Sequence, residues 1–332
     1  MPALDGIRAL SVLLVLAFHL EVPGFTGGFL PVSLFFTLSG YLITQVALAD
    51  ADRHGRLGLR RFWGRRFRRL MPAALVCLLL VAVTARLSSN FGGDHVRSDL
   101  LASLGYSANW RFAFEARTYA DLFASAPSPV QHFWSLAIEE QFYVVFPLLI
   151  VAVLSISRRA LPWVLGSLLA ASVIAGSLTH SHNLVYYGTH VRAAEILVGC
   201  LLALVMPIGR TVSDRTARTA AAVSVVGVVL LFVAVNRVDI ADGLVYRGGL
   251  AAFALVSAAV VVGSLVPGPV RWIFENRVLV AIGRISYGLY VFHWPVIVLV
   301  DERRTGWDGL PLGRSEEHTS ELQSRQYLVC RL

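Results

Sequence analysis

The 332-residue sequence contains no lysine, so all 29 of its basic residues are arginines. This absence excludes two enzyme classes that need a lysine side chain, the P-loop nucleotide-binding enzymes and those that form a lysine Schiff base. Charged residues are also scarce, at 15% of the chain against about 25% in soluble domains, while 56% of the residues are hydrophobic. The mean hydropathy of +0.66 therefore indicates a membrane protein rather than a soluble, fibrous or disordered chain.

Cysteine is rare as well. The three cysteines, Cys77, Cys200 and Cys330, lie far apart in apolar or terminal sequence. Cysteines at such spacing form neither a disulfide framework nor a metal site, and we expect no metal ion in this protein.

Long apolar runs dominate what is present. A helix needs about 20 mostly apolar residues to cross a bilayer. The sequence therefore predicts an all-α fold, a polytopic membrane bundle with about nine transmembrane helices, in the inner (plasma) membrane of the cell. The predicted spans are 7–22, 29–48, 70–87, 133–154, 162–179, 191–208, 219–236, 248–266 and 279–300.

Arginine is unevenly divided between the two sides of this predicted bundle. Segment 49–69 and the loops of the same parity carry 15 arginines, eight of them between positions 53 and 69, against 5 in the other loops. Because cytoplasmic loops are enriched in basic residues, we predict a cytoplasmic N-terminus and an outer location for segment 88–132. A basic segment beside a span sets topology, contacts lipid headgroups or binds a phosphorylated cosubstrate more often than it binds nucleic acid.

The last residues do not follow the membrane pattern. Residues 314–324 read Arg-Ser-Glu-Glu-His-Thr-Ser-Glu-Leu-Gln-Ser, which resembles the translation of a common sequencing-library adapter. We therefore expect one membrane domain over residues 1–313, a natural protein that continues beyond it, and a disordered, non-native tail over 314–332.

Ionisable residues inside the spans are the candidates for function, since each costs about 2.5–3.5 kcal/mol to insert. The alternative is a structural role in holding helices together. Arg8 and His19 are eleven residues apart, which places both on one helix face about 16 Å apart along the axis. Asp5 precedes Arg8 by three residues and can pair with it. A buried His19 is expected to be neutral and able to accept a proton, or else to donate to a backbone carbonyl.

A polar stripe opens the fourth span. His132, Ser135, Glu139 and Tyr143 fall on one face at helical spacing, and Glu140 points about 100° away. Two adjacent carboxylates near a membrane face are costly without a cation or a function.

An arginine-rich run, 60–69, leads into the third span. At helical spacing Arg61, Arg65, Arg68 and Arg69 are predicted to cluster on one side, with aromatic residues between them. The planar guanidinium group binds phosphate through two hydrogen bonds, although an anchor in the lipid headgroups would have the same pattern.

Other polar residues in the spans carry weaker signals. Ser39-Gly40 allows a close helix approach. Arg192 and Glu195 have the spacing of an intrahelical ion pair. Tyr290 and His293 lie in an apolar interior, where a polar cavity would suit them.

Five of these motifs, in order from residue 4 to about 300, resemble the integral-membrane acyltransferase type 3 family. They are Leu4-Asp5-Gly6-x-Arg8-Ala9 with His19, Phe35-Phe36-x-Leu38-Ser39-Gly40, the arginine run ending at Pro72, Ser135-Leu136-x-x-Glu139-Glu140-Gln141-Phe142-Tyr143, and Ser286-Tyr287-Gly288-x-Tyr290-x-x-His293-x-Pro295. One departure is Pro31-Val32-Ser33, where the family usually has Gly-Val-Asp.

The resemblance implies transfer of an acyl group, usually acetyl, from acyl-coenzyme A to a hydroxyl group of a surface glycan, a lipid-linked or peptidoglycan sugar, or a macrolide-type product. It implies His19 as general base, oriented by Glu139 or Glu140, with Arg8 beside the thioester. The coenzyme A phosphates would be held by Arg61, Arg65, Arg66, Arg68 and Arg69. The cavity around the substrates would be formed by Asp5, Ser39, His132, Ser135, Tyr143, Arg192, Glu195, Tyr290 and His293.

Alternatives remain at this point. Transfer could pass through an acyl-serine or acyl-histidine intermediate. Buried arginine, glutamate and histidine also mark transport paths, so a transporter or flippase of a glycan or acyl intermediate is a second hypothesis, although the sequence shows no internal repeat typical of transporters. A structural or sensory membrane subunit is the third.

Overall fold

A computed structural model describes residues 1–87, 95–115 and 127–300. Within these residues it contains helices and no strand, and nine helical spans are long and apolar enough to cross a membrane, which confirms the predicted polytopic bundle. The predicted tail over 314–332 lies outside the described residues. The long helices are α1 (Pro2–His19), α2 (Pro31–His54), α3 (Leu59–Leu87), α6 (Phe133–Ile156), α7 (Leu161–Leu178), α9 (Thr189–Val205), α10 (Asp214–Arg237), α11 (Leu250–Leu265) and α13 (Arg277–Val300).

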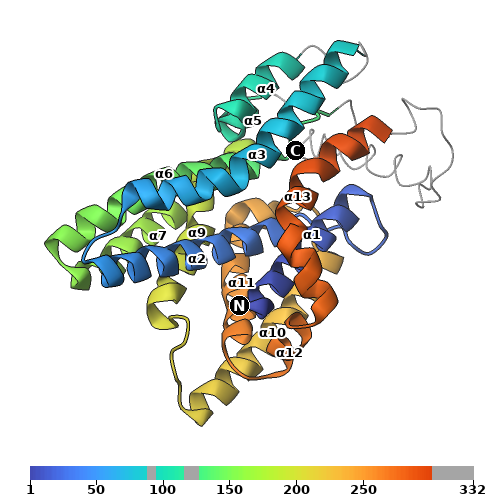
Figure 1. Cartoon of the computed structure of the whole chain (residues 1–332). Helices are drawn as coiled ribbons and strands as arrows, with labels where there is room; N and C mark the ends of the chain where they lie inside the picture. Colours follow the sequence, from blue (N-terminus) through green and yellow to red (C-terminus); the bar gives the residue numbers. More distant parts are fainter. Residues whose placement is uncertain (88–94, 116–126, 301–332) are drawn as a thin grey trace.

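Short elements that the apolar pattern did not predict complete the bundle (Figure 1). They are α4 (Val96–Leu104), α5 (Ala108–Ala113), α8 (His182–Tyr187), α12 (Pro269–Phe274), the 3₁₀ turn η2 (Arg158–Ala160) and the π-turn η3 (Val245–Gly249). The α3 helix also begins earlier than its predicted span, so the arginine run is helical and continuous with the apolar part. Arginine is a good helix former, and hydropathy alone could not show this extension.

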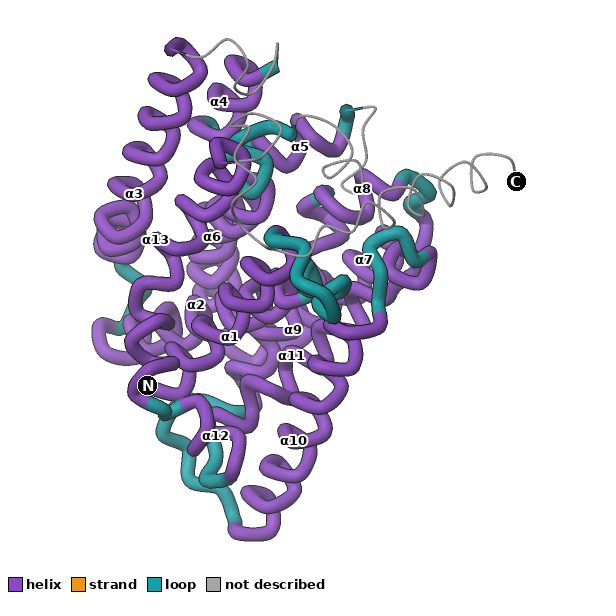
Figure 2. The backbone as a smooth tube through the Cα atoms, turned by 90° about the vertical axis from the view of Figure 1, so that its right-hand side faces the viewer, coloured by secondary structure: helices purple, strands orange, loops and turns teal. Residues whose placement is uncertain are grey.

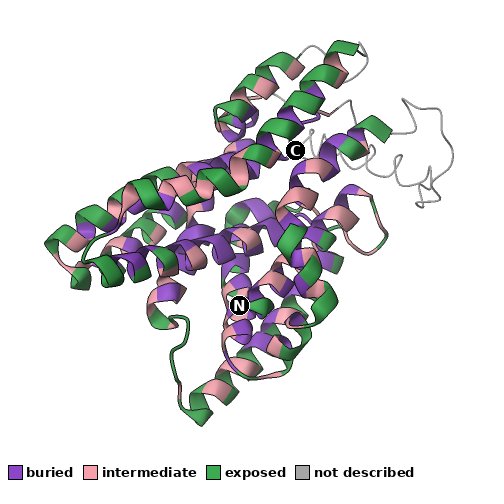
Figure 3. Cartoon of the chain, viewed as in Figure 1, coloured by how far each residue is buried: buried purple, intermediate pink, exposed green. Residues whose placement is uncertain are grey.

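Small residues set the closest contacts between the helices. A Cβ atom on Gly40 of α2 would lie 1.9 Å from the Ile196 carbonyl oxygen of α9, and one on Gly199 would lie 1.9 Å from the Thr37 carbonyl oxygen. Gly283 of α13 meets the Asp5 carbonyl of α1 in the same way. These contacts confirm the close approach predicted at Ser39-Gly40, and they bury the middle of the bundle (Figure 3).

Three of the long helices contain an internal proline, and in two of them, α6 and α13, the backbone carbonyl that the proline releases is bonded by another segment. A proline has no N–H for the carbonyl four residues earlier. The Tyr143 carbonyl, released by Pro147, accepts a hydrogen bond of 2.9 Å from the Trp63 indole N–H. The Val291 carbonyl, released by Pro295, lies 2.8 Å from Nε2 of His132. The prolines thus tie α6 to α3 and α13 to α6.

The bundle has two distinct ends. One, the arginine-rich end, carries residues 53–69, 158–159 and 210–218, and contacts such as that from the Ile208 N–H to the Gln45 side chain hold it together. Its cytoplasmic orientation stays a prediction. At the opposite end, the Gly27 N–H donates to the Val235 carbonyl at 2.8 Å. Figure 2 shows α4 and α5 at the other end of the molecule from α12.

We predict that Gly199→Ala destabilises the protein. Its Cβ atom would force α2 and α9 apart, and overpacking of this kind costs about 1–3 kcal/mol. Gly166→Ala in α7 is the matched control, because nothing lies within 4 Å of that Cβ position. Thermal unfolding in detergent should show a lower midpoint for Gly199→Ala alone; equal midpoints would contradict the close approach of the two helices.

Candidate active site

A polar cavity of about 280 Å³ lies among α1, α2, α3, α6 and α13. Its charged lining groups are Arg8 of α1, Arg66 and Arg69 of α3, and Glu139 of α6. Such charges inside a membrane domain are costly, which makes this cavity the candidate functional site. Hydroxyl groups complete the polar lining: Ser39, Ser135, Tyr143, Ser286, Tyr287 and Tyr290.

Three of the four residues of the predicted polar stripe face this cavity, and the fourth, His132, does not line it. Ser135, Glu139 and Tyr143 all line it, as their spacing predicted, while Glu140 does not. The Tyr143 hydroxyl donates to Glu139 at 3.4 Å and shares a short hydrogen bond with Ser39 of α2. The stripe thus presents one carboxylate to three arginines that line the same cavity.

Two of the three arginines of the cavity are held by neighbouring side chains. Arg8 donates to Asp5 at 3.2 Å, which confirms the predicted pair, although Asp5 itself does not line the cavity. The Arg66 guanidinium lies over the Tyr143 ring, 4.3 Å from its centroid. Such cation–π contact holds the guanidinium in place while leaving its N–H groups able to bind an anion.

Three buried histidines form an imidazole cluster, His19 of α1, His132 at the start of α6 and His293 of α13. Nε2 of His293 lies 3.1 Å from Nδ1 of His19, and the His132 ring centroid lies 5.4 Å from that of His293. The cluster adjoins the polar cavity through Tyr290, which lines the cavity and lies 5.3 Å from the His293 ring, centroid to centroid.

The structure corrects the expected orientation of His19. We expected Glu139 or Glu140 to orient this imidazole, but in the structure its Nδ1 lies 3.1 Å from Nε2 of His293, and the side chain also bonds the Val15 backbone. Glu139 instead faces the arginines of the polar cavity. The correction has a physical reason: α1 packs along α13, so the end of α1 meets the imidazole of that helix.

The arginine run divides between two faces of α3 rather than gathering on one. Arg66 and Arg69 enter the polar cavity. A second and larger pocket, the arginine pocket of about 1030 Å³, lies at the arginine-rich end between the start of α3 and the end of α6. Arg65 lines neither. The basic residues of the arginine pocket are Arg56, Arg60, Arg61 and Arg68.

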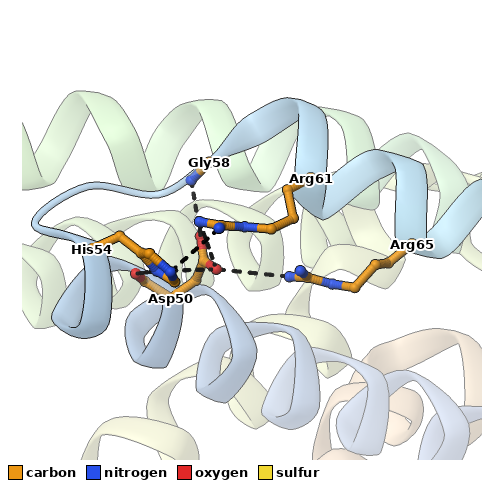
Figure 4. Close-up of polar contacts among 5 residues, drawn as sticks. All are labelled: Asp50, His54, Gly58, Arg61 and Arg65. Carbon is orange, nitrogen blue, oxygen red and sulfur yellow. Dashed lines mark hydrogen bonds and ion pairs between the residues drawn. The ribbon is translucent and has the colours of Figure 1, made fainter.

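Asp50 anchors the turn that begins this run (Figure 4). Its buried carboxylate accepts the Gly58 N–H at 2.9 Å and pairs with Arg61 at 3.2 Å and Arg65 at 3.8 Å. His54 lies 3.6 Å from the same carboxylate. We did not predict these contacts of Asp50 from the sequence. The feature that could have indicated them is an acidic residue at the end of a span, next to a segment with eight arginines.

Arg192 and Glu195 form a separate buried ion pair at 3.2 Å, as predicted from their spacing. They line neither pocket. The Arg192 guanidinium lies 5.3–5.4 Å from the ring centroids of Phe36, Trp134 and Tyr186. This pair therefore supports the wall of the cavity rather than its surface.

No group of three or more metal-ligand side chains is found in the described part of the chain.

The match to known families covers nearly all of the chain. The model of the acyltransferase family described as "Acyltransferase domain" matches residues 1–312. The chain belongs to this family. With the nine apolar spans of its described residues and with its bacterial relatives, this acyltransferase-family chain is a multi-pass protein of the plasma membrane.

Two curated relatives share this acyltransferase region. The chain is 39% identical over 319 residues to "Putative peptidoglycan O-acetyltransferase YrhL" of Bacillus subtilis, and 35% identical over 319 residues to "Peptidoglycan O-acetyltransferase OatA" of Listeria monocytogenes. Each match covers 90% of this chain and 49% of the relative, so the chain spans about half the length of these relatives. No solved structure matches the chain.

We predict that Asp50→Ala frees the start of α3 in this acyltransferase domain. Without the carboxylate, the Gly58 N–H and the Arg61 guanidinium lose their acceptor, so trypsin should cut at the arginines of 53–61 several-fold faster. Asp52→Ala is the matched control, because its pair with Arg158 is more than half exposed and such pairs contribute about 0–1 kcal/mol. Equal cleavage rates in the two variants, measured by mass spectrometry of the first fragments, would contradict the anchoring role of Asp50.

Proposed function

We propose that the chain is a membrane O-acyltransferase that moves an acyl group, usually acetyl, from acyl-coenzyme A to a hydroxyl group of a cell-surface glycan. The observation that carries this proposal is the polar cavity, which holds three arginines and one carboxylate inside the membrane domain and adjoins a cluster of imidazoles. The names of the relatives favour a peptidoglycan sugar as the acceptor.

The donor side of the proposal rests on the two pockets along α3. Arg68 lines the arginine pocket and the next residue, Arg69, lines the polar cavity, and we infer that one extended donor would span both. The phosphates of coenzyme A would bind Arg56, Arg60, Arg61 and Arg68, since guanidinium groups bind phosphate through paired hydrogen bonds. The thioester would then lie in the polar cavity beside Arg8, Arg66 and Arg69.

The acceptor side rests on His19. Its imidazole would take the proton of the attacking hydroxyl group, and the hydroxyl oxygen would add to the thioester carbonyl. The cavity arginines would stabilise the oxyanion that forms. Collapse of this intermediate expels the coenzyme A thiolate, which receives the proton from His19. With the arginine-rich end in the cytoplasm, as predicted, the donor arrives from inside the cell and the glycan from outside.

We predict that His19→Gln abolishes acyl transfer. A general base contributes about 10²–10⁴-fold to the rate, and the glutamine amide cannot take its place. Purified protein, acetyl-coenzyme A and a soluble peptidoglycan fragment should release thiol and form an O-acetyl ester with the wild type but not with the variant. Equal turnover would exclude His19 as the base. No transfer by the wild type, together with passage of a labelled glycan across vesicles, would favour a transporter.

We predict that the two arginine sites affect different kinetic constants. Arg60→Gln with Arg68→Gln removes contacts to the distant phosphates, which act equally in the ground and transition states, so the KM for acetyl-coenzyme A should rise about ten-fold or more at little change in kcat. Arg66→Met should instead lower kcat, because the Arg66 guanidinium would face the thioester in the polar cavity. Arg218→Gln in α10 is the matched control, since Arg218 is exposed and lines neither pocket. A similar rise in KM in the control would contradict the assignment of the arginine pocket.

A further inference from the structure

The polar cavity is apolar at one of its ends. Along α2 its lining residues run from Val32 to Val46, and α2 itself runs toward the arginine-rich end of the bundle. Val32, Phe35 and Phe36 therefore line the end of the cavity that lies away from the arginine pocket, which we call the far end. The α6 helix runs in the same direction, so its early lining residue Leu136 adds an apolar side chain to this far end.

A charged section lies next to the far end, at the level of Ser39. The Ser39 hydroxyl shares a short hydrogen bond with Tyr143, whose hydroxyl also bonds Glu139 and whose ring lies below the Arg66 guanidinium. Phe35 precedes Ser39 by four residues on the same face of α2, which is about one helical turn or 6 Å along the axis. A group held by the cavity arginines therefore has about one helical turn of space toward the far end.

Two aromatic rings form a wall at this far end, and we call Phe35 and Tyr290 the aromatic wall. Their ring centroids are 5.9 Å apart in an edge-to-face arrangement, and both residues line the cavity. The Tyr290 hydroxyl bonds Ser135 of α6 at 2.6 Å. The other side of Tyr290 meets the imidazole cluster, since its ring lies 5.3 Å from that of His293, centroid to centroid. The wall thus joins α2, α6 and α13 between the cavity and the cluster.

We propose that the aromatic wall limits the donor to a short acyl group, and that Phe35 is the residue that determines this specificity. The inference rests on the proposed function for the direction in which the donor binds. A donor whose phosphates lie in the arginine pocket enters the cavity from the end opposite the wall, so its acyl chain points to the far end. A two-carbon acetyl group ends before the wall, whereas a longer chain must displace the Phe35 ring.

The volume of the Phe35 ring is what carries this selectivity. The side chain has no polar group, and truncation of a packed ring leaves a cavity where the ring was. One methylene more or less in an apolar pocket changes the relative rate of two substrates by about 10–200-fold. A hexanoyl chain has four methylenes more than acetyl, so a wall at this position gives a strong preference for acetyl.

The kinetic test compares acetyl- and hexanoyl-coenzyme A as donors to one peptidoglycan fragment. We expect the wild type to prefer acetyl by about a hundred-fold or more in kcat/KM, and Phe35→Ala to shift this ratio toward hexanoyl by about ten-fold or more. Phe35→Leu, a smaller change in the packing, should give an intermediate shift.

Leu42→Ala is the matched control. Leu42 lines the same cavity on the same helix, two turns nearer the arginine-rich end, so its truncation enlarges the cavity without opening the far end. We expect the ratio of the two donors to stay as in the wild type. An unchanged ratio in both Phe35 variants, or an equal shift in Leu42→Ala, would overturn the proposal.

Binding of unreactive donors separates this inference from the proposed function. The S-ethyl and S-hexyl thioethers of coenzyme A lack the reactive carbonyl, and calorimetry measures their Kd without any transfer. We expect the wild type to bind the ethyl compound more tightly and Phe35→Ala to lose most of that difference. Equal binding of both compounds by the wild type would overturn the role of the wall alone. Binding of neither compound would reject the coenzyme A donor and the inference with it, whereas discrimination without acyl transfer would reject only the proposed reaction.

Discussion

The site depends on backbone carbonyl groups that the bundle leaves available in its interior. Hydrocarbon offers no hydrogen-bond donors, so a carbonyl without its helical partner must find one in the protein. Pro295 and Pro147 each create such a carbonyl, at Val291 and Tyr143. The groups that satisfy them come from distant segments. His132, just before α6, and Cys77 of α3 bond the Val291 carbonyl, and Trp63 of α3 bonds the Tyr143 carbonyl, which brings α3 and the start of α6 against α13 and a face of α3 against α6.

The cost of placing polar groups in the membrane also explains how the arginine run is divided between the two pockets. A guanidinium group inside a membrane domain needs either a counter-ion or an aromatic face, and only two members of the run enter the polar cavity, of which Arg66 lies on Tyr143. Arg61 and Arg65 remain at the end of the bundle and share the carboxylate of Asp50. The arginines therefore extend from an open pocket at the arginine-rich end into a smaller cavity. This distribution of positive charge would suit an anionic molecule that inserts one of its ends into the smaller cavity.

Much of the site could be predicted where the contacts are local. Helical spacing alone predicted the Asp5–Arg8 and Arg192–Glu195 pairs and the face shared by Ser135, Glu139 and Tyr143. Contacts between distant segments could not be predicted, because they depend on helix rotation and packing. His19 and His293 are 274 residues apart, and nothing in either segment shows that the two rings meet. Arg68 and Arg69 likewise line different pockets, because consecutive residues of a helix point about 100° apart. The rotation of α3 about its own axis decides which pocket each of them faces.

Tyr290 connects the two halves of the proposed reaction. Its hydroxyl group bonds Ser135 at 2.6 Å at the edge of the polar cavity, while its carbonyl holds His293 at 2.6 Å. Its side chain therefore lies between the cavity that would hold a thioester and His293, the ring that meets His19. Rotating the phenol breaks one hydrogen bond, worth about 1 kcal/mol net, and leaves the backbone carbonyl in place. The carbonyl that holds His293 therefore stays fixed when the phenol ring moves, because the moving and the fixed parts of Tyr290 are separated at its Cα atom.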